Sequence, residues 1–208
     1  MRPQRITRIA PHDVPPGAVG MCVTQGAIGR IIAHRQGGIP YSHVVLATGR
    51  GEMVHAPWRW VAHEPITRRW PRREIDWWAP REQLTDEEAR QLRAIAHTIH
   101  DRITYSWWAI ASFVLRGYPT RRGHGVYCSY LVAELWRVLR DYDFSGVGRT
   151  WQVAPREILA RLNARLGYWT YIGTTGGISP GDALAGSVSA ESPPRRVPHP
   201  RPPRRCGA

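Results

Sequence analysis

The chain has 208 residues, of which 42% are hydrophobic and 22% charged, values that are ordinary for one globular domain with a full-sized core. Its longest apolar run, residues 107–115, is far too short to span a bilayer. The three cysteines, Cys22, Cys128 and Cys206, are an odd set without metal-type spacing, which argues against a disulfide framework. No apolar segment follows residues 1–5, so we expect no secretory signal and a cytoplasmic or virion-associated location.

The charge balance is strongly basic. All 29 Lys and Arg residues are arginine, and against 16 acidic residues they give a formal net charge of +13. Guanidinium groups bind phosphate and carboxylate in a bidentate manner, so the arginine-rich surface should attract anionic polymers such as nucleic acid, anionic lipid or wall polymers. The alternative is a compositional bias of the genome with no selected partner.

Three segments precede the first candidate site. Residues 1–13 form a basic arm with little to pack. Residues 15–23 predict a turn that enters a short strand, in which Cys22 is an inert core residue. Residues 26–32 suit the start of a short helix.

The segment 41–56 predicts a β-hairpin with a histidine on each strand. His43 opens a β-branched apolar run, Gly49-Arg50-Gly51 forms the turn, and a second short strand ends at His55. A base near a thiol, with a third polar group orienting the base, is the arrangement that nucleophilic catalysis needs. Without such a thiol, the two histidines would be ordinary half-exposed strand residues.

Tryptophan is dense after the hairpin. Five of these rings lie at Trp58, Trp60, Trp70, Trp77 and Trp78. Residues 74–78, before Pro80, predict a further strand. We expect the rings in the core and at its rim; the alternative is a surface that stacks on sugars or lies at a membrane interface.

Two helices are predicted next. Thr85 and Glu88 form a capping box that opens the first, and residues 105–115 form the second, which is very apolar. His97 and His100 lie three residues apart on the first helix, a spacing compatible with a metal ion. No third ligand is evident, so we expect neither a metal nor another cofactor.

A third helix is predicted to begin close to Cys128. The apolar positions at steps of 3, 4, 7, 8 and 11 from it are Leu131, Val132, Leu135, Trp136 and Leu139. A thiol in the first turn lies at the positive end of the helix dipole, which favours the thiolate. We therefore expect Cys128 to alkylate fastest of the three thiols at pH 6 to 7; the alternative is a small, inert core residue.

The remaining chain contains one more predicted helix and a tail. Residues 155–167 predict the helix, with Pro155 in its first turn. From about Gly176 the composition changes to Pro, Gly, Ser, Ala and Arg, which cannot bury enough apolar surface to fold. The predicted organisation is thus the arm 1–13, one domain over 14–172 and a disordered tail over 173–208.

Two segments together resemble a known family. Residues 43–56 are similar to the histidine hairpin of the NlpC-type cell-wall cysteine peptidases, and residues 127–132 resemble their nucleophile helix. In the usual order the cysteine precedes the histidines. Here it follows them, which resembles the circularly permuted branch of this papain-like superfamily, related to the lecithin retinol acyltransferase group. Ala18 departs from the pattern, because an acid is usual at this point of the first strand's entry.

The resemblance implies an α+β fold in which a small antiparallel β-barrel or sheet packs against the nucleophile helix and additional helices. It also implies a cysteine hydrolase with a Cys-His-His triad. Cys128 would attack a carbonyl carbon, His43 would transfer the proton, and His55 would orient His43. The Cys128 backbone N–H and, as a candidate second donor, Tyr127 would hold the oxyanion.

The resemblance points first to amide bonds in peptides or peptidoglycan as the substrate. One alternative is an acyl-ester or lipid-directed transferase or hydrolase that uses the same site. Another is a non-catalytic, arginine-rich binding module that keeps only the fold.

Overall fold

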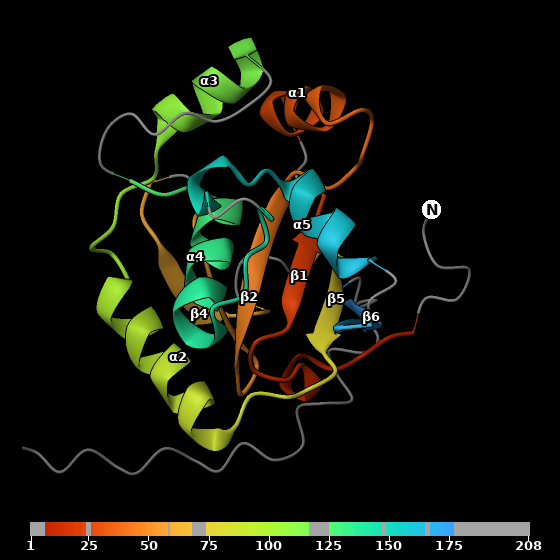
Figure 1. Cartoon of the computed structure of the whole chain (residues 1–208), viewed down its shortest axis with the longest axis vertical. Helices are drawn as coiled ribbons and strands as arrows, with labels where there is room; N and C mark the ends of the chain where they lie inside the picture. Colours follow the sequence, from red (N-terminus) through yellow and green to blue (C-terminus); the bar gives the residue numbers. More distant parts are fainter. Residues whose placement is uncertain are drawn as a thin grey trace, which may run out of the picture. The chain divides into compact units, whose positions relative to one another are not determined.

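A computed structural model describes residues 7–23, 26–57, 59–67, 74–116, 125–146, 149–164 and 167–176. The fold is α+β, as predicted: a six-stranded antiparallel sheet in the order β4-β3-β2-β1-β5-β6, with helices packed against it (Figure 1). The strands are β1 (Val19–Cys22), β2 (His43–Gly49), β3 (Glu52–His55), β4 (Ala62–Pro65), β5 (Ile75–Pro80) and β6 (Trp169–Thr175). The helices are α1 (Ala27–Arg35), α2 (Asp86–Ile99), α3 (Trp107–Arg116), α4 (Cys128–Arg140) and α5 (Pro155–Leu162), with short 3₁₀ turns η1 (Pro11–Asp13) and η2 (Thr150–Gln152).

The sheet is open, so the predicted closed barrel is wrong. Strands β4 and β6 are its two edges and do not pair with each other. The prediction missed β6, where the chain returns to pair with β5 across a register shift between Trp77 and Trp78. It also extended the last helix to Gly167, whereas α5 ends at Leu162. The predicted tail lies outside the described residues from residue 177 onward.

Part of the predicted N-terminal arm is tied to the sheet. Arg8 forms a bridge with Thr174 of β6, and the Thr174 N–H donates to the Thr7 carbonyl at 2.8 Å. The arm therefore covers a backbone edge that would otherwise be open to pairing.

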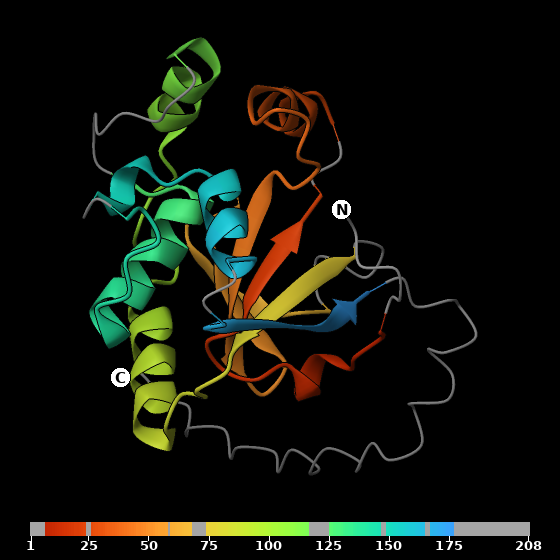
Figure 2. The same cartoon turned by 45° about the vertical axis from the view of Figure 1, so that its right-hand side comes forward.

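Both faces of the sheet are buried. Helices α2 and α4 cover one face (Figure 2), where Val44, Leu46 and Val54 pack against residues of α4 such as Val132. The opposite face carries Val45, and its core includes Met53, Ile75 and Trp77. Because β2 is buried over its whole length, groups at its ends are held rigidly. None of the helices described here is both long and apolar enough to cross a bilayer.

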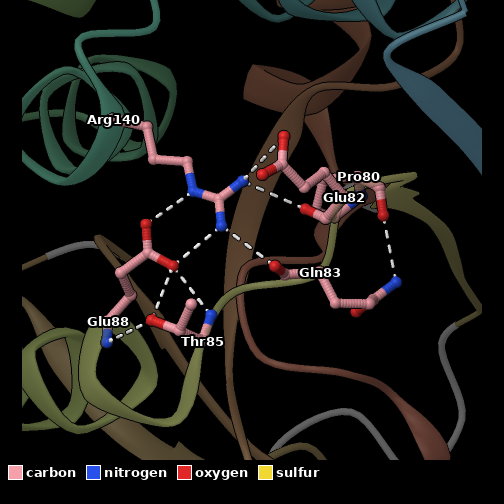
Figure 3. Close-up of polar contacts among 6 residues, drawn as sticks. All are labelled: Pro80, Glu82, Gln83, Thr85, Glu88 and Arg140. Atoms are coloured by element: carbon pink, nitrogen blue, oxygen red, sulfur yellow. Dashed lines mark hydrogen bonds and ion pairs between the residues drawn. The ribbon is translucent and has the colours of Figure 1, made fainter.

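The predicted capping box is confirmed and extends into a clamp between two helices (Figure 3). The Thr85 hydroxyl accepts from the Glu88 N–H, and the Glu88 carboxylate accepts from the Thr85 N–H. Arg140, at the end of α4, donates to both Glu88 oxygens at 2.7 Å and to the carbonyls of Glu82 and Gln83. This bidentate pair ties α4 to the start of α2.

The pair of Arg140 and Glu88 makes the free energy of unfolding depend on pH. The Arg140 hydrogen bonds lower the pKa of Glu88 to about 2 from its ordinary value of 4.5. A carboxylate with a lowered pKa stabilises the fold above about pH 4.5 and loses this contribution as the pH falls toward 2. Since water screens the pair, Arg140→Ala should cost about 1 kcal/mol near neutral pH.

Urea denaturation of both proteins at pH 7 and pH 3 measures this effect, and the difference in unfolding free energy should shrink at pH 3. Arg137→Ala is the matched control, because Arg137 forms a more exposed i,i+3 pair with Glu134 on the same helix. A loss that stays equal at both pH values would show that Arg140 stabilises α4 by packing alone.

Candidate functional site

The helix predicted to begin close to Cys128 is confirmed. Helix α4 begins at Cys128, Tyr127 is its N-cap residue, and the apolar positions Leu131, Val132, Leu135 and Trp136 are buried against the sheet. Cys128 is 4% exposed, so neighbouring residues cover it almost completely. Its backbone N–H belongs to the first turn, where N–H groups have no partner within the helix.

The expected thiolate is not found. Burial raises the pKa of the Cys128 thiol to about 11, and the backbone N–H groups of Val44 and Ser129 only partly oppose this shift. The sequence prediction considered only the helix dipole, whereas the tertiary fold removes the thiol from water. A thiol with this pKa is protonated and neutral near pH 7.

The contact with the Val44 backbone places the Cys128 sulfur next to β2, one residue from His43. The Ala47 N–H donates to Ala18 of β1, and because alternate N–H groups of a strand point to opposite sides, the Val44 N–H points toward β3. Strand β3 ends at His55, opposite Val45, and beyond this pair the Val44 N–H contacts the Cys128 sulfur. The sulfur thus lies beside the end of β2 that carries His43.

The histidine hairpin is confirmed, and its register brings the two imidazoles together. His55 lies opposite Val45, so it shares a face with Val45 and with His43 two residues earlier. The His43 Nε2 and His55 Nδ1 atoms are 3.0 Å apart, with the rings edge to face. Both histidines are buried, which holds this pair in one geometry.

A carboxylate that the sequence analysis did not single out completes this row of polar groups. The second nitrogen of His55, Nε2, lies 2.9 Å from Glu64 Oε1, and Glu64 is 5% exposed. Glu64 stands on β4 opposite Met53, on the face that carries His55. The only signal in the sequence was that Glu64 is an acidic residue in the short segment that follows the hairpin.

Two tyrosines stand near the thiol. The Tyr127 hydroxyl donates to the Trp151 carbonyl at 2.5 Å, so to serve the oxyanion it would have to leave that bond. Tyr105, just before α3, lies close enough that burial and the neighbouring Cys128 raise its pKa. The sequence analysis assigned Tyr105 no role.

The remaining histidines of this region lie on the other face of β4. His63 Nε2 is 2.9 Å from Thr48 Oγ1, its ring meets His97 edge to face, and its backbone N–H donates to His100. Among the described residues, no group of three or more His, Cys, Asp or Glu side chains is placed to hold a metal. His124 lies outside the described residues.

An apolar cleft leads to the thiol. Its empty volume is about 310 Å³, which includes space open to solvent, and it is lined by Ile32, Ser42, Ile110, Phe113, Tyr127, Cys128, Ser129, Ala154 and Pro155. The lining residues come from α1, α3 and the start of α5, and α1 and α3 lie at the same end of the molecule in both views (Figures 1 and 2). The serines excepted, every side chain that surrounds the sulfur in this cleft is apolar or aromatic.

The thiol environment predicts slow alkylation near neutral pH. With a pKa of about 11, Cys128 should react with iodoacetamide at pH 7 on the order of 100-fold more slowly than free cysteine, whose pKa is near ~8.5. The rate should rise about tenfold per pH unit between pH 7 and pH 9, because only the thiolate reacts. Mass-spectrometric mapping of the Cys128 adduct over this range is the measurement, and fast labelling that is constant between pH 6 and 8 would indicate a resting imidazolium–thiolate pair instead.

Comparisons with known proteins add one result. No family model and no curated protein matches the chain. Among solved structures, the chain is similar to the crystal structure of the metalloprotein yiiX from Escherichia coli O157:H7, DUF1105, with a TM-score of 0.54 and 12% sequence identity. The similarity covers 77% of this chain and 97% of that chain, and at this identity it shows the fold alone.

Proposed function

We propose that the chain is a cysteine-dependent hydrolase in which Cys128 is the nucleophile and His43 the general base. The observation that carries the proposal is the buried His43–His55 pair, 3.0 Å apart, in which His43 is next in the chain to Val44, whose backbone N–H contacts the Cys128 sulfur. A nucleophile, a base and a group that orients the base are the three parts of this chemistry. The order of these residues along the chain and the sheet packed on the nucleophile helix support a permuted, papain-like relationship.

The raised thiol pKa determines how the first step proceeds. Cys128 gives its proton to His43 as the sulfur attacks the carbonyl carbon, because the resting thiol is neutral. In this proposal the Cys128 backbone N–H, at the start of α4, stabilises the resulting oxyanion. His43 then returns the proton to the leaving group, and water hydrolyses the thioester.

The cleft favours a substrate with an apolar acyl group. Stem peptides of peptidoglycan carry charged and polar groups, for which Ile32, Ile110 and Phe113 offer no partner. An acyl chain or an apolar side chain would fill the same space favourably. This observation supports the second candidate, an acyl-ester or lipid-directed hydrolase or transferase on the same site, over the amidase.

A substrate panel with the Cys128→Ala variant as control tests the proposal. Purified peptidoglycan, peptide amides, and aryl and glycerol esters of increasing acyl length are incubated with each protein, and the products are identified by mass spectrometry. We expect release that depends on Cys128 and increases with acyl length. Equal, negligible release by both proteins, together with binding to anionic polymers, would instead support the arginine-rich binding module.

A further inference from the structure

We propose that the exposed apolar surface of α1 and α3 docks on an anionic lipid bilayer, and that the cleft at Cys128 takes its acyl substrate from that bilayer. The docking stands on the surface itself, and only the source of the substrate rests on the proposed function. The observation that carries the inference is that large exposed apolar side chains gather on the two helices that line the cleft.

The large exposed apolar side chains are concentrated in one part of the described structure. Six of them form what we call the α1–α3 surface: Ile28 and Ile31 of α1, Trp107, Trp108 and Leu115 of α3, and Trp60, which pairs with Thr104 just before α3. Helices α1 and α3 lie at the same end of the molecule (Figures 1 and 2). Among the described residues, Val138 of α4 is the one large exposed apolar side chain elsewhere. Single exposed apolar residues are ordinary, whereas a group of them marks an interaction surface.

Helix α1 has an apolar face that the protein covers only in part. Ile28, Ile31 and Ile32 are spaced three and four residues from the first, so they share one face of the helix. Ile32 is buried in a cluster with Phe113 of α3, whereas Ile28 and Ile31 are exposed. The exposed part of this face is therefore available to an apolar partner.

Helix α3 is apolar on two opposite sides. Ala109 and Phe113, four residues apart, are buried, whereas Trp108 and Leu115, seven residues apart, point away from them and are 51% and 76% exposed. A helix that is apolar on both sides is typical of an environment without water on either side. Tryptophan suits the level of the lipid headgroups in particular, because its ring is apolar and its N–H is polar.

The charges around the α1–α3 surface fit an anionic bilayer. Residues 14–51 and 102–127 contain no acidic residue, while Arg30 and Arg35 of α1 are exposed. The Arg59 guanidinium lies over the Trp60 ring, 5.7 Å from its centroid, and the Arg59 carbonyl accepts from the N–H of Tyr105 before α3. Arginine beside tryptophan is typical of a membrane interface. A second copy of this chain, with its net charge of +13, would instead bring positive charge against positive charge.

The same two helices form part of the cleft that contains the thiol. Ile32 of α1 and Ile110 and Phe113 of α3 line the cleft together with Cys128. Docking through α1 and α3 brings the bilayer next to these helices, so an acyl chain exchanges one apolar environment for another. This is the arrangement that an enzyme acting on lipid esters needs.

Co-flotation of the full chain with lipid vesicles is the first test. The wild type should bind vesicles made of equal parts phosphatidylcholine and phosphatidylglycerol more tightly than vesicles of phosphatidylcholine alone. Ile31→Ser and Trp108→Ser should each lower the partition coefficient about tenfold, since burying one large apolar side chain contributes at least ~1.5 kcal/mol. Val138→Ser is the matched control, because Val138 is 58% exposed but lies on α4, and this variant should bind as the wild type does.

The charge contribution is tested on the mixed vesicles. Arg35→Gln should weaken binding about fivefold, which corresponds to about 1 kcal/mol for one basic residue at an anionic surface, and should reduce the dependence of binding on salt. Arg50→Gln is the matched control, because Arg50 is exposed in the turn at the other end of β2 from α1. Every variant keeps the arginines of residues 177–208, so the differences among variants report on the α1–α3 surface.

Two results would overturn the docking surface. The first is binding by folded Ile31→Ser and Trp108→Ser that equals the binding of Val138→Ser, with thermal melting as the check on folding. The second comes from sedimentation without lipid: a dimeric wild type and a monomeric Trp108→Ser would make the α1–α3 surface an interface between two copies of the chain.

Turnover separates the docking from the proposed function. Cys128→Ala should bind vesicles as the wild type does, because binding needs no thiol. With a lipid ester in mixed vesicles and a soluble aryl ester as substrates, Trp108→Ser should lose more activity toward the lipid ester. Equal losses toward both esters would contradict the uptake of substrate from the bilayer. Vesicle binding that depends on Trp108, in a wild type that turns over neither ester, supports the docking surface and contradicts the proposed function.

Discussion

Cys128→Ala and His43→Ala are each expected to reduce kcat/KM by about 10⁴-fold or more, because each removes a group whose bonds change in the transition state. Residues that act as one unit are not additive, so the double variant should be hardly slower than either single variant. The measurement is kcat/KM for the best ester or amide substrate, with thermal melting to show that each variant folds.

His12→Ala is the control for His43→Ala, because His12 lies in η1 with a largely exposed side chain and no part in the site. It should keep full activity. Turnover at the wild-type level in His43→Ala would show that His43 is not the general base.

Substitutions of His55 are expected to differ in activity according to the hydrogen bonds that each new side chain can form. His55→Ala removes the partner of His43 and leaves the buried Glu64 carboxylate without this donor, so both activity and stability should fall. A glutamine at this position can accept from His43 through its carbonyl and donate to Glu64 through its amide. We therefore expect His55→Gln, and to a smaller extent His55→Asn, to retain more activity than His55→Ala, measured as kcat/KM alongside urea denaturation.

His63→Ala is the control for the His55 substitutions. It is one residue from Glu64, but its ring contacts Thr48 and His97 on the other face of β4. His63→Ala should therefore retain activity. If His55→Ala were fully active and His63→Ala inactive, the third group would have to be sought on that face.

The parts of the site that were predictable depend on local patterns. The β-branched apolar run with a glycine turn predicted β2 and β3, and the spacing of Leu131, Val132 and Leu135 predicted α4 starting at Cys128. The helix pattern reflects one buried face, and the continuous apolar run of β2 reflects a strand that is buried on both faces. The two-residue turn at Arg50-Gly51 alone would put His55 opposite Leu46; the register shift between Ala47 and Gly49, which the sequence analysis did not predict, puts His55 opposite Val45 and on the face of His43.

The parts that were missed depend on distant segments. Strand β4 is four residues with one polar, one acidic and one proline position, so only its pairing with β3 makes it a strand and brings Glu64 to His55. Strand β6 likewise exists through pairing with β5. The raised pKa of Cys128 comes from burial, and the cleft at the thiol is lined by residues from separate parts of the chain, among them Ile32 of α1, Phe113 of α3 and Pro155 of α5.

The central claim, that Cys128 forms a covalent acyl-enzyme with His43 as its base, is tested most directly by intact-protein mass spectrometry during turnover of an aryl ester. Quenching in acid at the earliest times should trap one acyl group per chain, and peptide mapping should place it on Cys128. The adduct should be absent in Cys128→Ala and should form far more slowly in His43→Ala. Turnover without any acyl adduct on Cys128, or an adduct that forms equally fast in His43→Ala, would contradict the claim.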